Sequence, residues 1–403
     1  PCSPTTPGPT SLKTGASMRR TGQSSNRWMG IPSLLKAWFS RRGVQHPRHG
    51  GIATKRNSVA YCVSLVIAAL VFVPGYALSG ETNDLTATVT TWTVALYVSG
   101  DNSLERFWDD SSLPGLLLLQ ENSMFKIVAY VDRLSVPGTE IVEVYGDEWG
   151  VVANLEEMDF GSGATFEWFL EDVSLKYPSE KLAVVAWDHG YAWRYISDDV
   201  TSGSRITMPA LQTAIQNSGV YIDVLAFDAC NMAAVEVAYQ LSLTRLVGIM
   251  VGSEESVPTT GFPYDLMLGP SAADASRTPA QMATDMVDGF RAFYEPQTWA
   301  STVALSAVDV ASIGAAGATM TSWVGAMHSC LPLYAKNYKL VLKSSYSAWA
   351  THYHVDLADF GDNLLAAASI TDEGLRTSTA AVVSAIDTSV IVQWGGRAAE
   401  ESR

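Results

Sequence analysis

Two residues that can carry nucleophilic catalysis follow two apolar runs of the chain. Cys230 stands three positions beyond the run Ile222–Phe227, and His189 stands two positions beyond Leu182–Trp187. A thiol is a weak nucleophile until a base such as an imidazole takes its proton. The pattern therefore predicts an acyl-transfer dyad, with Cys230 as nucleophile and His189 as base. Taken alone, a packing role for the cysteine and a turn for the histidine stay open.

The two apolar runs are expected to be neighbouring parallel strands. The 41 positions between His189 and Cys230 fit one strand–loop–helix–strand unit, with the helix expected at 208–217. Parallel strands present their carboxyl ends at the same sheet edge, where open α/β sheets hold reactive groups. The matched placement of the two residues therefore favours an active site.

Backbone groups beside both residues could stabilise a tetrahedral intermediate. The N–H groups of Gly190 and Cys230 are predicted oxyanion donors, assisted by a helix expected to begin at about Met232. Asp188 could orient the imidazole or cap a turn, and the turn cap is the preferred interpretation.

Acidic residues near Cys230 suggest a pocket for a positive charge. Asp228 would repel a thiolate unless it points into a pocket that receives a cation, which predicts Arg or Lys on the acyl side of the scissile bond. Glu254 and Glu255 follow the next apolar run and could add charge to that pocket. A solvated loop is the alternative for this pair.

Strand-like and helix-like segments alternate along the chain, which predicts an α/β fold with a mainly parallel sheet. Apolar runs through whole strands agree with burial on both faces. The expected strands are 93–98, 126–131, 182–187, 222–227, 246–251, 302–307 and 389–393, with a hairpin over 140–155. The expected helices are 103–120, 165–177, 208–217, 232–241, 279–294, 310–328 and 374–387, and 191–206 and 256–269 are expected loops.

Charge is distributed unevenly over the 403 residues. Ten of the 26 Lys and Arg residues and none of the 41 Asp and Glu residues lie in 1–80, which leaves a net charge of −25 in 81–403. So acidic a domain argues against nucleic acid as a partner.

The N-terminal part has the pattern of an exported protein. Residues 1–56 are basic and are expected to be disordered. Residues 57–80 carry no charge and are predicted to be a signal peptide or a membrane anchor. A buried helix is the alternative for 57–80. Residues 81–91 are a predicted linker to a domain over 92–403, which would then lie outside the cell or on its surface. Membrane contact is expected only through 57–80.

Four cysteines are too few for a disulfide scaffold in a chain of this length. Cys330 is expected to pack as a small buried residue. His352, His354 and Asp356 have metal-ligand types, but no supporting Cys or His cluster accompanies them, so no metal site is predicted.

Several segments together resemble the clostripain family of cysteine peptidases over about residues 92–390. They are TVALYVSGDNSLE (93–105), LAVVAWDHGYAWR (182–194), IDVLAFDACNMAAVEVAYQL (222–241), VGSEESVPTTGFPYDLML (251–268), SAVDVASI (306–313) and VDLADF (355–360). The resemblance implies a caspase-like three-layer α/β/α sandwich, with His189 as base, Cys230 as nucleophile and Asp228 binding a basic side chain. It also implies self-cleavage in the loop after the catalytic histidine, where Arg194 and Arg205 are candidates. No cofactor is required for the chemistry; some members need calcium, which the acidic pair Asp198-Asp199 could hold.

Two features depart from the family pattern. Thr259-Thr260 stands where an acidic or Gly-rich loop is common, and no apolar strand follows Trp394, which suggests a truncated domain. The expected protein is a monomeric endopeptidase acting on proteins or peptides with basic residues. A catalytically silent cell-surface binding protein and another cysteine acyl-transfer enzyme, a transpeptidase or amidase, are the alternatives.

Overall fold

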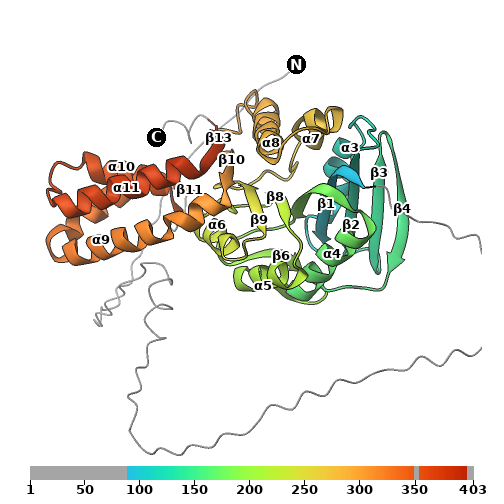
Figure 1. The fold of residues 1–403 in the computed structure, drawn as a ribbon, viewed down its shortest axis with the longest axis horizontal. Coiled ribbons are helices and arrows are strands. Elements are labelled where there is room, and N and C mark those ends of the chain that lie inside the picture. Colours follow the sequence, from blue (N-terminus) through green and yellow to red (C-terminus); the bar gives the residue numbers. More distant parts are fainter. Residues whose placement is uncertain (1–88, 349–353, 397–403) are drawn as a thin grey trace, which may run out of the picture. The chain divides into compact units, whose positions relative to one another are not determined.

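A nine-stranded sheet forms the centre of the computed structural model, which describes residues 89–348 and 354–396 (Figure 1). The strand order is β13-β10-β9-β8-β5-β1-β2-β3-β4. The five strands from β9 to β2 are parallel, and two antiparallel strands extend the sheet at each edge. The strands of this sheet are β1 (Thr90–Gly100), β2 (Phe125–Arg133), β3 (Thr139–Tyr145), β4 (Glu148–Leu155), β5 (Ser179–Trp187), β8 (Ile222–Asp228), β9 (Val247–Gly252), β10 (Ala304–Asp309) and β13 (Val390–Gly395).

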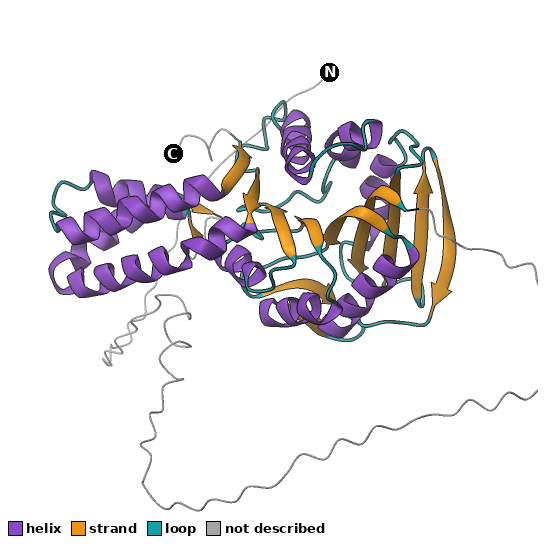
Figure 2. Ribbon diagram, viewed as in Figure 1, coloured by secondary structure: helices purple, strands orange, loops and turns teal. Residues whose placement is uncertain are grey.

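Helices cover both faces of the sheet (Figure 2). One face packs on α3 (Leu113–Leu116), α7 (Tyr264–Ala273) and α8 (Pro279–Tyr294), and the other on α4 (Gly163–Lys176), α5 (Met208–Ser218) and α6 (Val235–Ser242). Side chains alternate along β1, so that Leu96 and Val98 join the first core while Ala95 and Tyr97 join the second. Burial on both faces explains why the central strands are apolar throughout.

Three helices near the C-terminus have a small core of their own. They are α9 (Val310–Ser344), α10 (Leu357–Ala366) and α11 (Glu373–Ser389), and Trp323, Leu364 and Leu375 are buried between them. Cys330 belongs to this core as a free, buried thiol, as expected. The strand β13 then returns the chain to the edge of the main sheet beside β10.

The α/β sandwich is confirmed, and the structure differs from several of the expected elements. The helix expected over 103–120 consists of short pieces: α2 (Glu105–Phe107), a π-helical turn (Trp108–Ser112) and α3, which contains Pro114. The loop expected over 256–269 contains the start of α7. The 191–206 loop is a hairpin of β6 (Tyr195–Asp199) and β7 (Ser204–Thr207), and β11 (Ser347–Ala348) pairs with β12 (His354–Val355).

The predicted N-terminal segments 1–56 and 57–80, and most of the linker 81–91, lie outside the described residues. Of the helices within 89–348 and 354–396, none is long and apolar enough to cross a membrane.

Candidate active site

The carboxyl ends of β5 and β8 bring the segments of His189 and Cys230 into contact. Trp187 pairs with Asp228 in the parallel register, and the N–H of Asp188 donates to the carbonyl of Asp228 at 3.3 Å. Gly190 then lies so close to the second segment that a Cβ atom there would meet the carbonyl oxygen of Cys230 at 2.7 Å. A glycine is therefore needed at 190 for the two segments to pack.

Cys230 occupies a sharp turn after β8. Asn231 has a φ of +60°, a left-handed conformation that Asn tolerates better than most residues. Its N–H donates to the carbonyl of Glu255 at 2.9 Å, and its side-chain amide donates to the carbonyl of Glu254 at 2.8 Å. These bonds fix the turn that presents the half-buried thiol. The helix expected at Met232 begins only at Val235, so α6 does not start directly behind the cysteine.

The thiol and the imidazole each have a different partner in this conformation. The thiol of Cys230 donates to the carbonyl of Val257 at 3.8 Å, and Nε2 of His189 lies 3.1 Å from the hydroxyl of Ser103. Burial raises the pKa of the Cys230 thiol and lowers that of the His189 imidazole. Both shifts favour the uncharged forms of the thiol and the imidazole.

The backbone donors proposed from the sequence are both unengaged. Among the described residues, the N–H groups of Gly190 and Cys230 donate no hydrogen bond to another part of the chain. Two such groups on contacting segments could bind a developing oxyanion.

Asp188 stabilises the loop after β5. Its carboxylate accepts from the N–H of Asp198 and, at 2.7 Å, from the amide of Asn102. Asn102 also donates to the carbonyls of Ser99 at 2.9 Å and Asp198 at 2.8 Å, so it holds three segments together. These contacts agree with a turn cap.

Asp228 is buried, with 5% of its surface exposed. Its Oδ2 accepts from the hydroxyl of Tyr264 at 2.9 Å and from the N–H of Phe262 at 3.1 Å. Burial raises its pKa to about 7, against the opposing effect of these two donors. A Cβ atom on Gly261 would lie 3.1 Å from Oδ2, so the carboxylate faces the backbone of the 258–264 loop.

Glu254 and Glu255 lie in the loop that supports the cysteine turn. Glu255 is buried, and its carboxylate accepts from the hydroxyl of Tyr346. The carbonyls of both glutamates hold Asn231 in place. Glu254 and Glu255 therefore support the turn of Cys230, in addition to any contribution to a substrate pocket.

The two arginines of the 191–206 hairpin differ in their contacts. Arg205 lies on β7 and makes a bidentate ion pair with Asp198, with nitrogen–oxygen distances of 2.7 and 3.0 Å. Arg194 is exposed in the turn before β6, with its guanidinium 4.9 Å from the ring centre of Tyr191. This ion pair also engages Asp198, one of the two carboxylates that the sequence suggested for calcium.

Four residues of this site were not predicted as such: Asn102, Ser103, Asn231 and Tyr264. The first two follow β1, the neighbour of β5, and Ser103 was assigned to the helix expected over 103–120. The polar residues directly after the predicted strand 93–98 were the sequence signal that could have identified Asn102 and Ser103 as site residues. Away from the dyad, Asp101, Asp132 and Glu157 are the described carboxylates close enough to share a metal ion.

Comparisons with known proteins identify the family and show a shared fold. The sequence model of the clostripain family, peptidase family C11, matches residues 96–402. A secreted C11 cysteine protease from Bacteroides thetaiotaomicron, solved with an irreversible peptide inhibitor, has a similar fold, with a TM-score of 0.61 and 19% identity over 76% of this chain and 84% of that chain. An inactive zymogen C11 protease from Parabacteroides distasonis gives a TM-score of 0.59 and 19% identity over 77% of this chain and 85% of that one. No curated protein sequence matches significantly.

Proposed function

Because the chain belongs to the clostripain family and is a cysteine-type endopeptidase, we propose that it is exported and cleaves peptide bonds after Arg or Lys, with Cys230 as nucleophile and His189 as base. The observation that carries the proposal is the contact of the His189-Gly190 segment with the Ala229-Cys230 segment at the ends of β5 and β8. This contact puts a thiol, an imidazole and two unengaged N–H groups on one sheet edge.

The proposed reaction runs through a thioester. The imidazole of His189 takes the proton of the Cys230 thiol as sulfur attacks the substrate carbonyl, and the N–H groups of Gly190 and Cys230 hold the oxyanion. The C–N bond breaks, and the imidazolium gives its proton to the leaving amine. Water then attacks the thioester with His189 as base, releasing the acid and restoring the thiol.

Proton transfer requires a change from the described conformation. The thiol must turn away from the carbonyl of Val257 so that its proton can reach a ring nitrogen of His189, whose Nε2 contacts Ser103. Catalytic hydrogen bonds often tighten only when substrate is bound. Substrate binding in the loop of Val257 would release the thiol at that moment.

The preference for basic residues rests on Asp228. This carboxylate lies on the same strand end as Cys230, two positions before it, and faces the loop 258–264. A substrate guanidinium or ammonium reaching it would stabilise the ionised form and lower its raised pKa.

A panel of reporter peptides tests the proposal. Purified protein is offered otherwise identical peptides with Arg, Lys, Asn or Gln before the reporter group, with the Cys230→Ala variant as the blank. Cleavage of the Arg and Lys peptides far faster than of the Asn and Gln peptides is the expected result. Asn cleavage in their place would overturn the specificity, and no cleavage by folded, processed protein would favour a silent binding protein. Transfer of the acyl group to an added amine in preference to water would indicate a transpeptidase.

We also propose self-cleavage in the 191–206 hairpin, at Arg194 in preference to Arg205. Both arginines are exposed, but Arg194 lies in a turn outside the strands, whereas the backbone of Arg205 is paired with β6 and its side chain makes an ion pair with Asp198. Arg194→Gln should therefore abolish the corresponding fragments on a denaturing gel, and Arg205→Gln should leave them. Intact mass measurement of the fragments identifies the bond, and loss of processing only in the Arg205 variant would contradict the assignment.

Export is supported by the uncharged segment 57–80 after a basic stretch. The fold is shared with a Bacteroides thetaiotaomicron C11 protease that is described as secreted. N-terminal sequencing of protein recovered outside the producing cell distinguishes a cleaved signal from an anchor, and retention of the whole chain in the cytoplasm would contradict export.

A further inference from the structure

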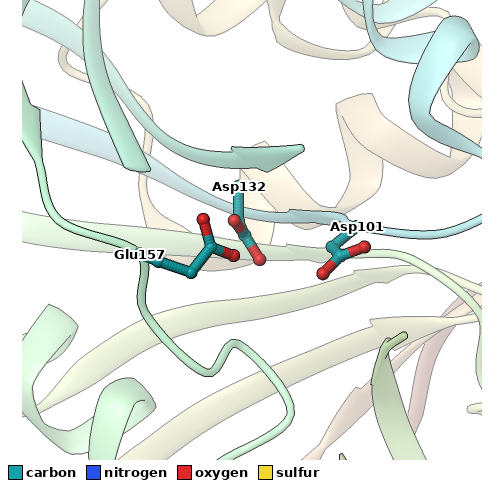
Figure 3. Close-up of side chains that lie close together, drawn as sticks. All are labelled: Asp101, Asp132 and Glu157. Carbon is teal, nitrogen blue, oxygen red and sulfur yellow. The ribbon is translucent and has the colours of Figure 1, made fainter. Parts of the chain in front are cut away.

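Three carboxylates converge where the strands β1, β2 and β4 end. Asp101 directly follows β1, Asp132 lies near the end of β2, and Glu157 follows β4. One oxygen from each lies within 4.8 Å of the others. Figure 3 shows the carboxylate of Asp132 between those of Glu157 and Asp101.

No described side chain forms a hydrogen bond or an ion pair with the central carboxylate. Asp132 and Asp101 are both 0% exposed, and neither oxygen of Asp132 nor Oδ1 of Asp101 has a hydrogen bond. Ser99 and Thr139 flank Asp132 in the strand register, and their hydroxyls are likewise buried without a partner. Buried polar atoms are almost always satisfied, so this many unsatisfied oxygens in one place indicates a missing positive ligand.

No basic side chain of the described chain neutralises the cluster. The adjacent Arg133 contacts Asp109 at 3.0 Å and Glu140 at 3.6 Å instead. Three carboxylates with oxygens within 4.8 Å of one another repel each other unless a positive charge lies between them.

We propose that Asp101, Asp132 and Glu157 bind a divalent cation, and that the cation is calcium. Carboxylate and hydroxyl oxygens are ligands that hard cations prefer. Calcium accepts ligands at about 2.3–2.6 Å in irregular shells, whereas magnesium demands a near-ideal octahedron at about 2.0–2.1 Å. Ligands from three separate segments suit the more tolerant ion. This site differs from the Asp198-Asp199 pair suggested by the sequence.

The same segment connects the proposed cation to the histidine. Asp101 also accepts hydrogen bonds from the N–H groups of Val200, at 2.9 Å, and Thr201, at 3.0 Å, in the hairpin after His189. Two positions further on, Ser103 contacts the imidazole. A cation that fixes Asp101 would therefore fix the hairpin and the Ser103 contact. This effect on cleavage rests on the proposed function, whereas binding of the cation does not.

Calcium titration of the full 403-residue chain tests the site, with Cys230→Ala as the background so that self-cleavage is absent. Isothermal titration should give one calcium per chain. The Tm should rise by about 5 °C at calcium roughly 100-fold above its Kd. Asp132→Asn and Glu157→Gln should each weaken binding at least about tenfold, while Asp147→Asn, in the exposed turn between β3 and β4, should match the parent. Metal-free Asp132→Asn should also melt above the metal-free parent, because it removes an unpartnered buried charge.

Two results would overturn the site. One is a parent protein whose Tm and heat signal do not respond to millimolar calcium. The other is unchanged calcium binding in folded Glu157→Gln and Asp132→Asn. A protein that binds calcium but cleaves no peptide would support this site and contradict the proposed function. Magnesium binding more tightly than calcium would contradict the assignment of the ion.

Discussion

Replacing Cys230 by Ala is expected to lower kcat/KM for an Arg reporter peptide at least about 10⁴-fold, with the fold and Tm preserved. The thiol is half-buried, and its hydrogen bond to the carbonyl of Val257 is long, at 3.8 Å, so its removal costs little stability. His189→Ala should cause a loss of similar size. Because the two residues act as one unit, the double variant should be no slower than either single variant.

The control for this prediction is the second thiol of the domain, Cys330. It is buried between the C-terminal helices, and Cys330→Ala should leave kcat/KM unchanged even where it lowers Tm. Additive losses in the Cys230 and His189 variants would show that the residues do not form a dyad. Retained turnover in Cys230→Ala would place the nucleophile elsewhere.

The protonation states of the dyad set its pH profile. Burial lowers the pKa of His189, so the imidazole stays neutral and able to accept a proton at pH values below its usual range near 6.5. Activity on a peptide that makes no charge contact should therefore fall only below that pH. The raised pKa of the Cys230 thiol means that attack depends on the base at neutral pH, because little thiolate preexists.

The sequence was sufficient to predict features set by local pattern. Apolar runs located the central strands, and their alternation with helices predicted that the strands before His189 and Cys230 are neighbours, as β5 and β8 are. The bounds expected for α8, 279–294, agree with the structure. There Thr278 and Gln281 form a capping box, and Pro279 follows at the first helical position, so the start signal is local.

Features set by long-range contacts could not be predicted. The loop signals Pro258, Gly261 and Pro263 hid the start of α7, where Tyr264 is buried and bonded to Asp228. Ser103 was assigned to a helix, and only the pairing of β1 with β5 brings it to His189. The acidic cluster has the same origin, since Asp132 and Glu157 become neighbours only through the antiparallel edge of β2, β3 and β4.

Asp228→Asn is expected to lower kcat/KM for Arg and Lys peptides by about 10²- to 10³-fold, with little effect on a Gln peptide cleaved at a low basal rate. The amide keeps an oxygen that can accept from Tyr264 and Phe262, so the loop should retain its conformation, but the negative charge is lost. A reduction of the same size for charged and uncharged peptides would instead mean that Asp228 only supports the cysteine turn.

The raised pKa of Asp228 gives this prediction a second, independent measurement. With a pKa of about 7, the carboxyl is largely neutral at pH 6 and charged at pH 8, so KM for an Arg peptide should fall over that interval in the parent and stay constant in Asp228→Asn. The folded pKa lies above the unfolded value of about 3.9, so burial of this group costs stability that grows as pH rises from 4 to 7, reaching about 3–4 kcal/mol. The Asn variant should therefore melt above the parent at pH 8, and this difference should shrink as pH falls towards 4. An Asn variant that melts above the parent at pH 8 but binds the Arg peptide less well would show that Asp228 acts in substrate binding. An Asn variant that melts below the parent at pH 8 would show that Asp228 is structural.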